Sequence, residues 1–178
     1  MLEEKLLIWK LKRGDREALR VLYDKYKGRL RAIAGAMLGD YETAEDVLHD
    51  VFVKFAENAG QIRIDKSLKN YLTASVVNRV RDEFRRRKPV VLEADSNERC
   101  GAESGRPDRR VEDNEKMRLL TEALSQVPYE QREVIVMHLK GGMKFKEIAK
   151  MQRASIGTIY GRYRYGLEKL RTILNGSI

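Results

Sequence analysis

Residues 144–174 constrain the fold most strongly, because two amphipathic helical segments are separated by a turn of only three residues. The first segment spans residues 144–151, and the turn is Gln152-Arg153-Ala154. The second follows Ser155, a favourable N-cap, and repeats apolar side chains at helical spacing: Ile156, Ile159, Tyr163, Leu167, Leu170 and Leu174. Helices joined this closely must cross sharply, which predicts a helix-turn-helix.

The outer face of the second segment has the composition of a DNA-reading helix. It combines hydroxyl, aromatic and cationic side chains: Thr158, Tyr160, Arg162, Arg164 and Lys169. A recognition helix uses such a face in the major groove, where its N-terminal residues reach the base edges. An ordinary helical hairpin with a solvated basic face is the alternative for this segment.

The overall charge favours a polyanionic partner. The net charge is +9 and the isoelectric point is about 9.6. Cys100 is the single cysteine, so an internal disulfide is excluded, and neither histidine lies near it in sequence. We therefore expect no metal and no cofactor. No apolar run is long enough to span a membrane, so a cytoplasmic chain without membrane insertion is expected.

Charge and proline divide the chain into three parts. Residues 1–88 hold 20 basic and 14 acidic side chains, and residues 115–178 hold 12 and 6. Residues 89–114 have a net charge of −3 and contain Pro89 and Pro107. We predict an all-α fold with two small helical domains, 1–88 and 115–178, joined by a flexible acidic linker at 89–114. A plain solvated tether is an equal alternative for the role of that linker.

Capping residues place the helices of the first domain. Asp15 opens a helix that ends near Gly39, and Thr43 with Asp46 three residues later forms a capping-box pattern for the next. Ser67 caps a third helix, which Pro89 stops. In the second domain, one helix covers residues 117–127, and another starts at Pro128 and ends at the glycine pair 141–142.

The third helix of the first domain is the strongest candidate for a second nucleic-acid surface. Its end carries six cations: Arg79, Arg81, Arg85, Arg86, Arg87 and Lys88. Such a cluster binds phosphates by releasing counterions. Its start, Lys69-Asn70-Tyr71, and the preceding loop 61–66 combine amides, cations and an aromatic ring, which suits unstacked single-stranded bases. A core position is an equal alternative for Tyr71.

The second helix of the first domain has an outer face of the opposite charge, which predicts a contact with another protein. Its outer face carries Glu42, Glu45, Asp46, Asp50 and Glu57. Such a face repels DNA, so we expect it to meet a basic protein surface; a solvated acidic face is the alternative. His49 beside Asp50 has no nucleophile or second base nearby, so no catalytic residues are predicted. His138 is expected to be structural.

Five motifs in order resemble the extracytoplasmic-function (ECF) sigma factors of bacterial RNA polymerase. They cover residues 14–19, residues 44–52, Tyr71-Leu72 with Asn78-Arg79 and the arginine run, Val127-Pro128, and residues 147–149 with 157–159. The resemblance implies a subunit, not an enzyme, that binds core polymerase at its clamp helices and flap. It also implies promoter DNA as a ligand, an anti-sigma factor as a partner, and a linker that threads a basic channel of polymerase.

The resemblance also implies roles for particular residues. Polymerase binding would fall to Glu45, Asp46, His49, Asp50 and Phe52. The minus-ten element would be melted, with one base flipped out, by Arg63, Lys66, Lys69, Asn70, Tyr71, Asn78, Arg79, Arg85, Arg86 and Arg87. The minus-thirty-five duplex would be contacted by Ser155, Thr158, Tyr160, Arg162 and Arg164.

Two glycines depart from the family pattern. Gly161 and Gly166 lie inside the predicted recognition helix, and each lowers helix propensity by about 1 kcal/mol relative to alanine. A softer recognition helix is therefore expected. Two other classes of protein are alternatives. An autonomous helix-turn-helix regulator gives the acidic helix no role, and an enzyme acting on nucleic acid would need a catalytic constellation, which is not visible.

Overall fold

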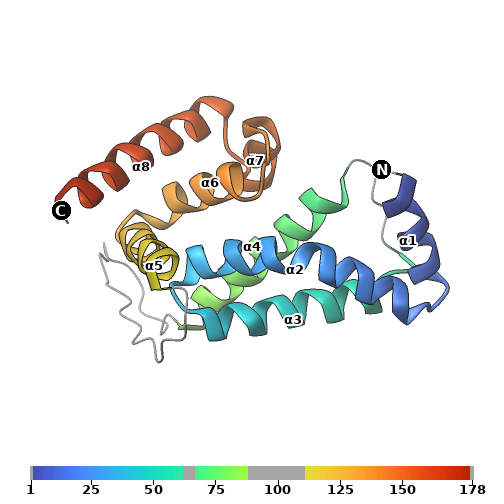
Figure 1. Cartoon of the computed structure of the whole chain (residues 1–178). Helices are drawn as coiled ribbons and strands as arrows, with labels where there is room; N and C mark the ends of the chain where they lie inside the picture. Colours follow the sequence, from blue (N-terminus) through green and yellow to red (C-terminus); the bar gives the residue numbers. More distant parts are fainter. Residues whose placement is uncertain (1, 62–66, 88–110, 177–178) are drawn as a thin grey trace.

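The computed structural model describes residues 2–61, 67–87 and 111–176, and within these ranges the regular structure is entirely helical (Figure 1). The predicted all-α class is confirmed. The helices form two groups, α1–α4 and α5–α8. None of the described helices is both long enough and apolar enough to cross a membrane.

The first domain is built around α2 (Arg16–Leu38), against which α3 (Tyr41–Glu57) and α4 (Leu68–Arg87) pack. Its core holds fully buried aliphatic side chains from all three helices: Leu22, Leu30, Ile33, Met37, Val47, Leu48, Leu72, Val76 and Val80. Each such side chain contributes about 1.5–3 kcal/mol by leaving water. This shared core holds α3 and α4 at fixed positions on α2.

One helix was not predicted. α1 (Leu2–Lys12) packs against α2, at the end of the domain far from α5 (Figure 1). The Tyr26 hydroxyl donates a 2.6 Å hydrogen bond to the Glu4 carboxylate, which fastens α1 to α2. This hydrogen bond, together with Lys25, lowers the pKa of Glu4.

The predicted caps hold with one correction. Asp15 accepts hydrogen bonds from the backbone of Glu17 and Ala18, and Ser67 Oγ accepts one from Asn70 N. The second helix, however, is capped by Asp40 and not by Thr43, because Gly39 takes a left-handed conformation (φ 75°) that ends α2 directly before Asp40. Thr43 lies in the first turn and is hydrogen-bonded to Asp40.

The second domain comprises α5 (Val111–Ser125), α6 (Tyr129–Leu139), α7 (Phe145–Gln152) and α8 (Ile156–Gly176). Val134, Met137, Ile148 and Ile159 are almost completely buried where α6, α7 and α8 meet. α5 begins at Val111, inside the segment 89–114 that was predicted to be linker. Residues 88–110 lie outside the described residues, so the rest of that prediction stays untested.

α7 and α8 form the predicted helix-turn-helix. Arg153 ends α7 in a left-handed conformation (φ 51°), and Ser155 Oγ accepts a 3.0 Å hydrogen bond from Thr158 N, so Ser155 caps α8 as expected. Ile159 and Leu170 face inward. Ile156 was predicted to face inward too but is 45% exposed, because it lies in the first turn of α8, beyond the reach of the core.

Gly166 has a packing role that the sequence did not indicate, while the expected softness of the recognition helix stays a prediction. α6 and α8 approach so closely there that a Cβ on Gly166 would lie 2.8 Å from Ile135 Cδ1 and 3.0 Å from Gln131 Cβ. A larger side chain would hold α8 away from α6, so this glycine permits the packing. Gly161 has no such neighbour: its Cβ would meet only the Tyr165 ring, at 4.0 Å.

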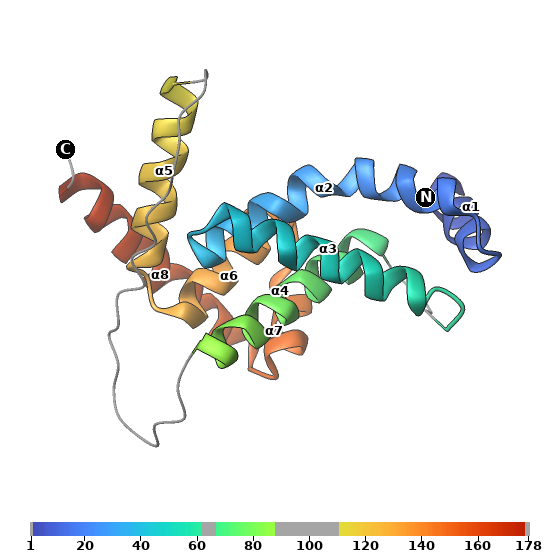
Figure 2. The same cartoon turned by 90° about the horizontal axis from the view of Figure 1, so that it is seen from below.

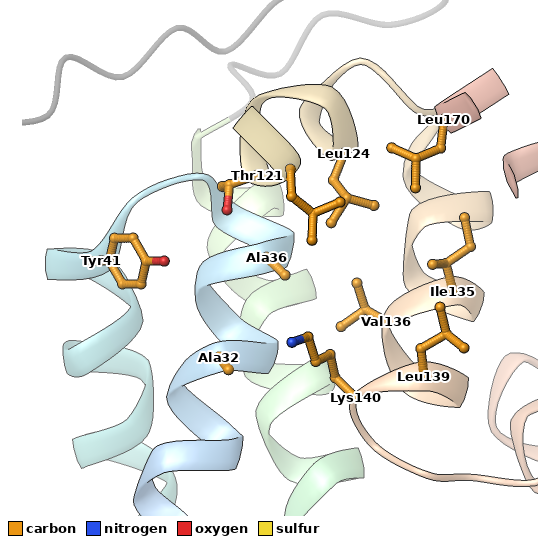
Figure 3. A pocket seen from close by; sticks show the side chains of 11 residues that line it. Ala32, Ala36, Tyr41, Thr121, Leu124, Ile135, Val136, Leu139, Lys140 and Leu170 are labelled. Atoms are coloured by element: carbon orange, nitrogen blue, oxygen red, sulfur yellow. The ribbon is translucent and has the colours of Figure 1, made fainter. Parts of the chain in front are cut away.

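The two domains pack against each other. α5 and α6 pack against α2, and Figure 1 shows α3 on the far side of the first domain from them. Figure 2 shows the same arrangement from below. The seam is largely apolar, and it leaves a cavity of about 70 Å³ lined by Ala32, Ala36, Leu124, Val136, Leu139 and neighbours (Figure 3). Arg132 Nη1 spans the seam and donates a 2.8 Å hydrogen bond to Met37 O.

Candidate nucleic-acid and polymerase interfaces

A pocket between α3 and α4 is the most distinctive feature of the first domain's predicted DNA surface. Its volume is about 300 Å³, and its lining mixes aromatic, amide and charged side chains: Val51, Lys54, Phe55, Asn58, Tyr71, Ser75, Asn78, Arg79 and Asp82. Tyr71 is half-buried, with its ring centroid 6.0 Å from that of Phe55, while Asn78 is exposed. Tyr71 therefore packs on the core and lines the pocket at once, and its contact with unpaired bases stays a prediction.

Arg79 is buried and paired with protein in this arrangement, and its role at the minus-ten element stays a prediction. Arg79 is 9% exposed, and its guanidinium donates hydrogen bonds to Asp50 at 2.8 Å and to Glu83 at 3.0 Å. Burial would lower the pKa of Arg79, but the hydrogen bonds that it donates to these two carboxylates raise the pKa above its ordinary value. The Asp50 pair joins α4 to α3, the Glu83 pair lies within α4, and Arg79 itself lines the pocket.

The two ends of α4 differ in what they contact. Lys69 and Asn70 at its start face the second domain, where Lys69 Nζ lies 3.4 Å from Gly142 O and Asn70 Nδ2 donates to Glu147 at 2.7 Å. Arg85 and Arg86 near its end are exposed, with only loose ion pairs within the helix. Arg63 and Lys66 lie outside the described residues, as does the side chain of Arg87.

The outer face of α8 is mostly exposed. Ser155, Thr158, Tyr160 and Arg164 are all exposed, so four of the five residues predicted for duplex DNA are accessible. Arg162 is the exception: its guanidinium donates to Gln152 Oε1 at 2.7 Å and pairs with Glu130.

An aromatic stack supports this face from behind. Tyr160 packs on Phe145 at 4.6 Å between ring centroids, and Phe145 stacks on His138 at 4.2 Å. His138 Nδ1 lies 2.8 Å from Met143 O, so the structural role predicted for this histidine fits its contacts. The stack fixes α7 against α8 and limits the rotation of Tyr160.

The acidic face of α3 lies away from both α4's start and α8. Glu45, Asp46 and His49 are exposed, and Glu45 pairs with Arg31 at 2.9 Å. Phe52 corrects the predicted set: it is 5% exposed and packs edge-on against Tyr23, so it belongs to the core and not to the docking face. Among the described residues, no group of His, Cys, Asp and Glu gathers as metal ligands would.

Sequence reasoning missed the contact between Arg81 and Glu133. The two are separated by 52 residues, and Arg81 Nε donates to Glu133 Oε2 at 2.9 Å across the seam between the domains. Arg81 had been treated only as one cation in a basic run. A signal was present, since Glu133 adjoins the continuous apolar stretch 134–137, where a charge has to find a partner.

The structure combines two helical domains, each with a cationic helix, and an acidic face that lies apart from both helices. This combination is typical of a transcription initiation factor. Residues 22–90 match the family described as Sigma-70 region 2, and residues 117–170 match Sigma-70, region 4. The chain belongs to the ECF sigma factors.

Two curated relatives are similar over almost the whole chain. The ECF RNA polymerase sigma factor SigW of Bacillus subtilis is 26% identical over 173 residues, covering 92% of both chains. The RNA polymerase sigma factor CarQ of Myxococcus xanthus is 27% identical over 161 residues, covering 90% of this chain and 91% of that one.

Solved structures share the fold. CnrH in complex with the cytosolic domain of CnrY matches with a TM-score of 0.73 at 19% identity, covering 99% of each chain. The sigma factor RpoE of Bartonella quintana, in complex with the anti-sigma factor NepR, matches with a TM-score of 0.63 at 21% identity, covering 88% of this chain and 98% of that one.

Proposed function

We propose that the chain is a promoter-specificity subunit that binds core RNA polymerase, recognises the minus-ten and minus-thirty-five elements and promotes local melting. The observation that carries this proposal is that three surfaces are separate and differ in the sign of their charge and in the domain that carries them. The pocket and cations of α4 suit unpaired DNA, the exposed face of α8 suits duplex DNA, and the acidic face of α3 suits a basic protein surface.

The pocket between α3 and α4 is proposed to hold the flipped base of the minus-ten element. A volume of about 300 Å³ is sufficient for one nucleobase, with Tyr71 as the stacking surface and Asn78 as an amide that can read a base edge. Extruding a base costs a few kcal/mol, so capturing it in a preformed pocket favours local melting.

α8 is proposed to enter the major groove of the minus-thirty-five duplex. Its N-terminus presents Ser155 and Thr158, and Tyr160 and Arg164, which follow in the helix, are also exposed. Phosphate contacts there set the register, while contacts to base edges carry the specificity. The aromatic stack behind Tyr160 keeps this face rigid.

The chain itself is proposed to make no bond, since polymerase carries out the chemistry. It acts in the cytoplasm, where polymerase and DNA are, and an anti-sigma factor is the proposed antagonist. The acidic linker is proposed to follow a basic channel of polymerase, which would explain the sign of its charge.

Charge reversal on α3 tests the docking step. Asp46→Arg should weaken association with core polymerase by roughly 10-fold or more, because a like charge then faces the proposed basic surface. Asp46 is exposed, so the fold should survive; Asp50 is less suitable, because it holds Arg79. Affinity is measured by titrating core polymerase with fluorescently labelled chain.

The matched control is Asp24→Arg, which reverses an exposed charge on α2 instead. It should bind core polymerase like the wild type. Equal affinities for both variants would remove α3 from the docking role, and tight binding to duplex DNA without any core association would favour an autonomous regulator.

A further inference from the structure

Arg162 differs from the other cations on the outer side of α8, because protein groups hold its guanidinium. Its side chain is 23% exposed, whereas Arg164 and Lys169 are exposed residues. Nη1 of Arg162 donates to Gln152 Oε1 at 2.7 Å, and Nη2 pairs with the Glu130 carboxylate. A guanidinium carries five N–H donors in one plane, so donors remain for a ligand while these two contacts limit the orientation of the plane.

The two acceptors differ in how firmly they hold Arg162. The Glu130 side chain is 65% exposed, so solvent screens its ion pair with Arg162 and the pair contributes little. Gln152 is half-buried at the end of α7 and has a second hydrogen-bond partner of its own, Glu133. The contact with Gln152 therefore determines the direction in which the guanidinium points.

Glu133 fixes which end of the Gln152 amide faces Arg162. Gln152 Nε2 donates to Glu133 Oε1 at 3.0 Å, and Glu133 is 1% exposed. Because an ionised carboxylate only accepts and a guanidinium only donates, an amide between them satisfies both partners in one orientation alone. Glu133, Gln152 and Arg162 lie on α6, α7 and α8, so this series of hydrogen bonds is built into the second domain itself.

The position of Arg162 on α8 suits contact with a base edge. Thr158 is exposed and lies one turn earlier on the same side of the helix, in the N-terminal part that faces the bases in a recognition helix. An arginine held in a fixed plane can donate two parallel hydrogen bonds to O6 and N7 of guanine. A phosphate contact requires no such orientation, and the exposed Arg164 and Lys169 are suited to it.

We propose that Gln152 and Glu133 are positioning residues, which orient Arg162 toward a guanine edge in the duplex that α8 contacts. The inference rests on the proposed function, because it assigns α8 to the minus-thirty-five element. Gln152 and Glu133 act through Arg162, so they determine the base preference at one position of that element. Arg164 contributes to affinity at every sequence instead.

A promoter with a randomised minus-thirty-five element tests this assignment. Core polymerase carrying the full chain is incubated with a duplex pool built on a chain-dependent promoter, and the bound DNA is isolated and sequenced. The wild type should prefer guanine at one position by roughly 10-fold, and Arg162→Ala should lose the preference at that position alone. Gln152→Met keeps the length of the side chain but removes its hydrogen bonds, so it should lose most of the same preference.

Three further variants separate positioning from a general defect. Gln126→Met changes an exposed glutamine of the same domain and should keep the full preference. Adding Gln152→Met to Arg162→Ala should change nothing further, because the effect of Gln152 passes through Arg162. Glu133→Gln can donate as well as accept, which allows the Gln152 amide to reverse, so it should lower the same preference by less than Gln152→Met does. Preferences at the other positions, unchanged in each variant, show that the fold is intact.

A full guanine preference in Gln152→Met, or a further loss when that change is added to Arg162→Ala, would overturn the proposal. An equal effect of Arg162→Ala at all positions would overturn it too, because that is the signature of a phosphate contact. An unchanged preference in Glu133→Gln would contradict the role of Glu133. Each of these results still shows a sequence-specific complex, so the proposed function would stand. A wild-type complex without any preference in the randomised element would instead contradict the proposed function of α8.

Discussion

The two helices proposed to contact DNA, α4 and α8, differ in how their functional side chains are held. On α4, Lys69, Asn70 and Arg79 already have protein partners, and Arg79 itself lines the pocket. On α8, Thr158 and Arg164 project from an exposed face that rests on an aromatic stack.

This difference shows that similar charge does not make two surfaces equally available. The start of α4 is in contact with the second domain, while most of the residues on the outer side of α8 are accessible. Arg162 is the link between the two, because its partner Gln152 also bonds the carboxylate that holds α4. The predictions below change α8 without directly changing α4.

The largest effect is expected from Gly166→Val. The added side chain would overlap Ile135 and Gln131 and push α8 away from α6, at a cost of about 3 kcal/mol to the free energy of unfolding. Urea denaturation followed by circular dichroism measures this cost. Gly161→Val adds the same atoms at a position without close neighbours. It should leave the free energy of unfolding unchanged or raise it by a few tenths of a kcal/mol, which is about the difference in helix propensity between glycine and valine. Equal losses at the two positions would mean that α8 does not pack as described.

An intermediate effect is expected from Arg164→Ala. Loss of one exposed cation from the α8 face should weaken binding of the polymerase complex to duplex promoter DNA by about 1–3 kcal/mol. Electrophoretic mobility shifts with the polymerase complex measure it. Arg171→Ala removes a cation nearer the end of α8 and should have a smaller effect; the reverse order would move the DNA contact along the helix.

The smallest effect is expected from Ser155→Ala. Its hydroxyl caps α8 by accepting from Thr158 N, and losing an N-cap costs about 1 kcal/mol. Thermal unfolding should show a slightly lower midpoint. Thr172→Ala also removes a hydroxyl from α8, but one bonded to a helix carbonyl, so little change is expected. A loss at Thr172 as large as that at Ser155 would argue against the capping role.

Much of the fold could be predicted because its signals are local. Asp15, Ser67 and Ser155 each cap the helix that follows them, and the spacing of apolar residues identified the helix-turn-helix. α1 was missed because no cap or clear apolar stripe marks it. Two residues near the start of α3 have the chemistry of an N-cap, Asp40 and Thr43. The capping-box pattern favoured Thr43, but the left-handed Gly39 ends α2 directly before Asp40, which is the cap in the structure.

The candidate site was less predictable because its geometry depends on contacts between distant residues. The burial of Arg79 follows from how α4 packs on α2 and α3, which no local pattern reveals. The role of Gly166 depends on Ile135 across the domain core, so the sequence suggested only a loss of helix propensity. Likewise, the Arg81–Glu133 pair joins two domains that were expected to be only tethered.

Transcription from templates with altered promoter elements tests the central claim most directly. Core polymerase is reconstituted with the chain on genomic fragments, and start sites are mapped with and without the chain. For a chain-dependent start, the minus-ten and minus-thirty-five sequences are then replaced separately. We expect each replacement to abolish most initiation, because α4 and α8 act on different elements of one promoter. Starts that do not depend on the chain, or that survive loss of either element, would contradict the account.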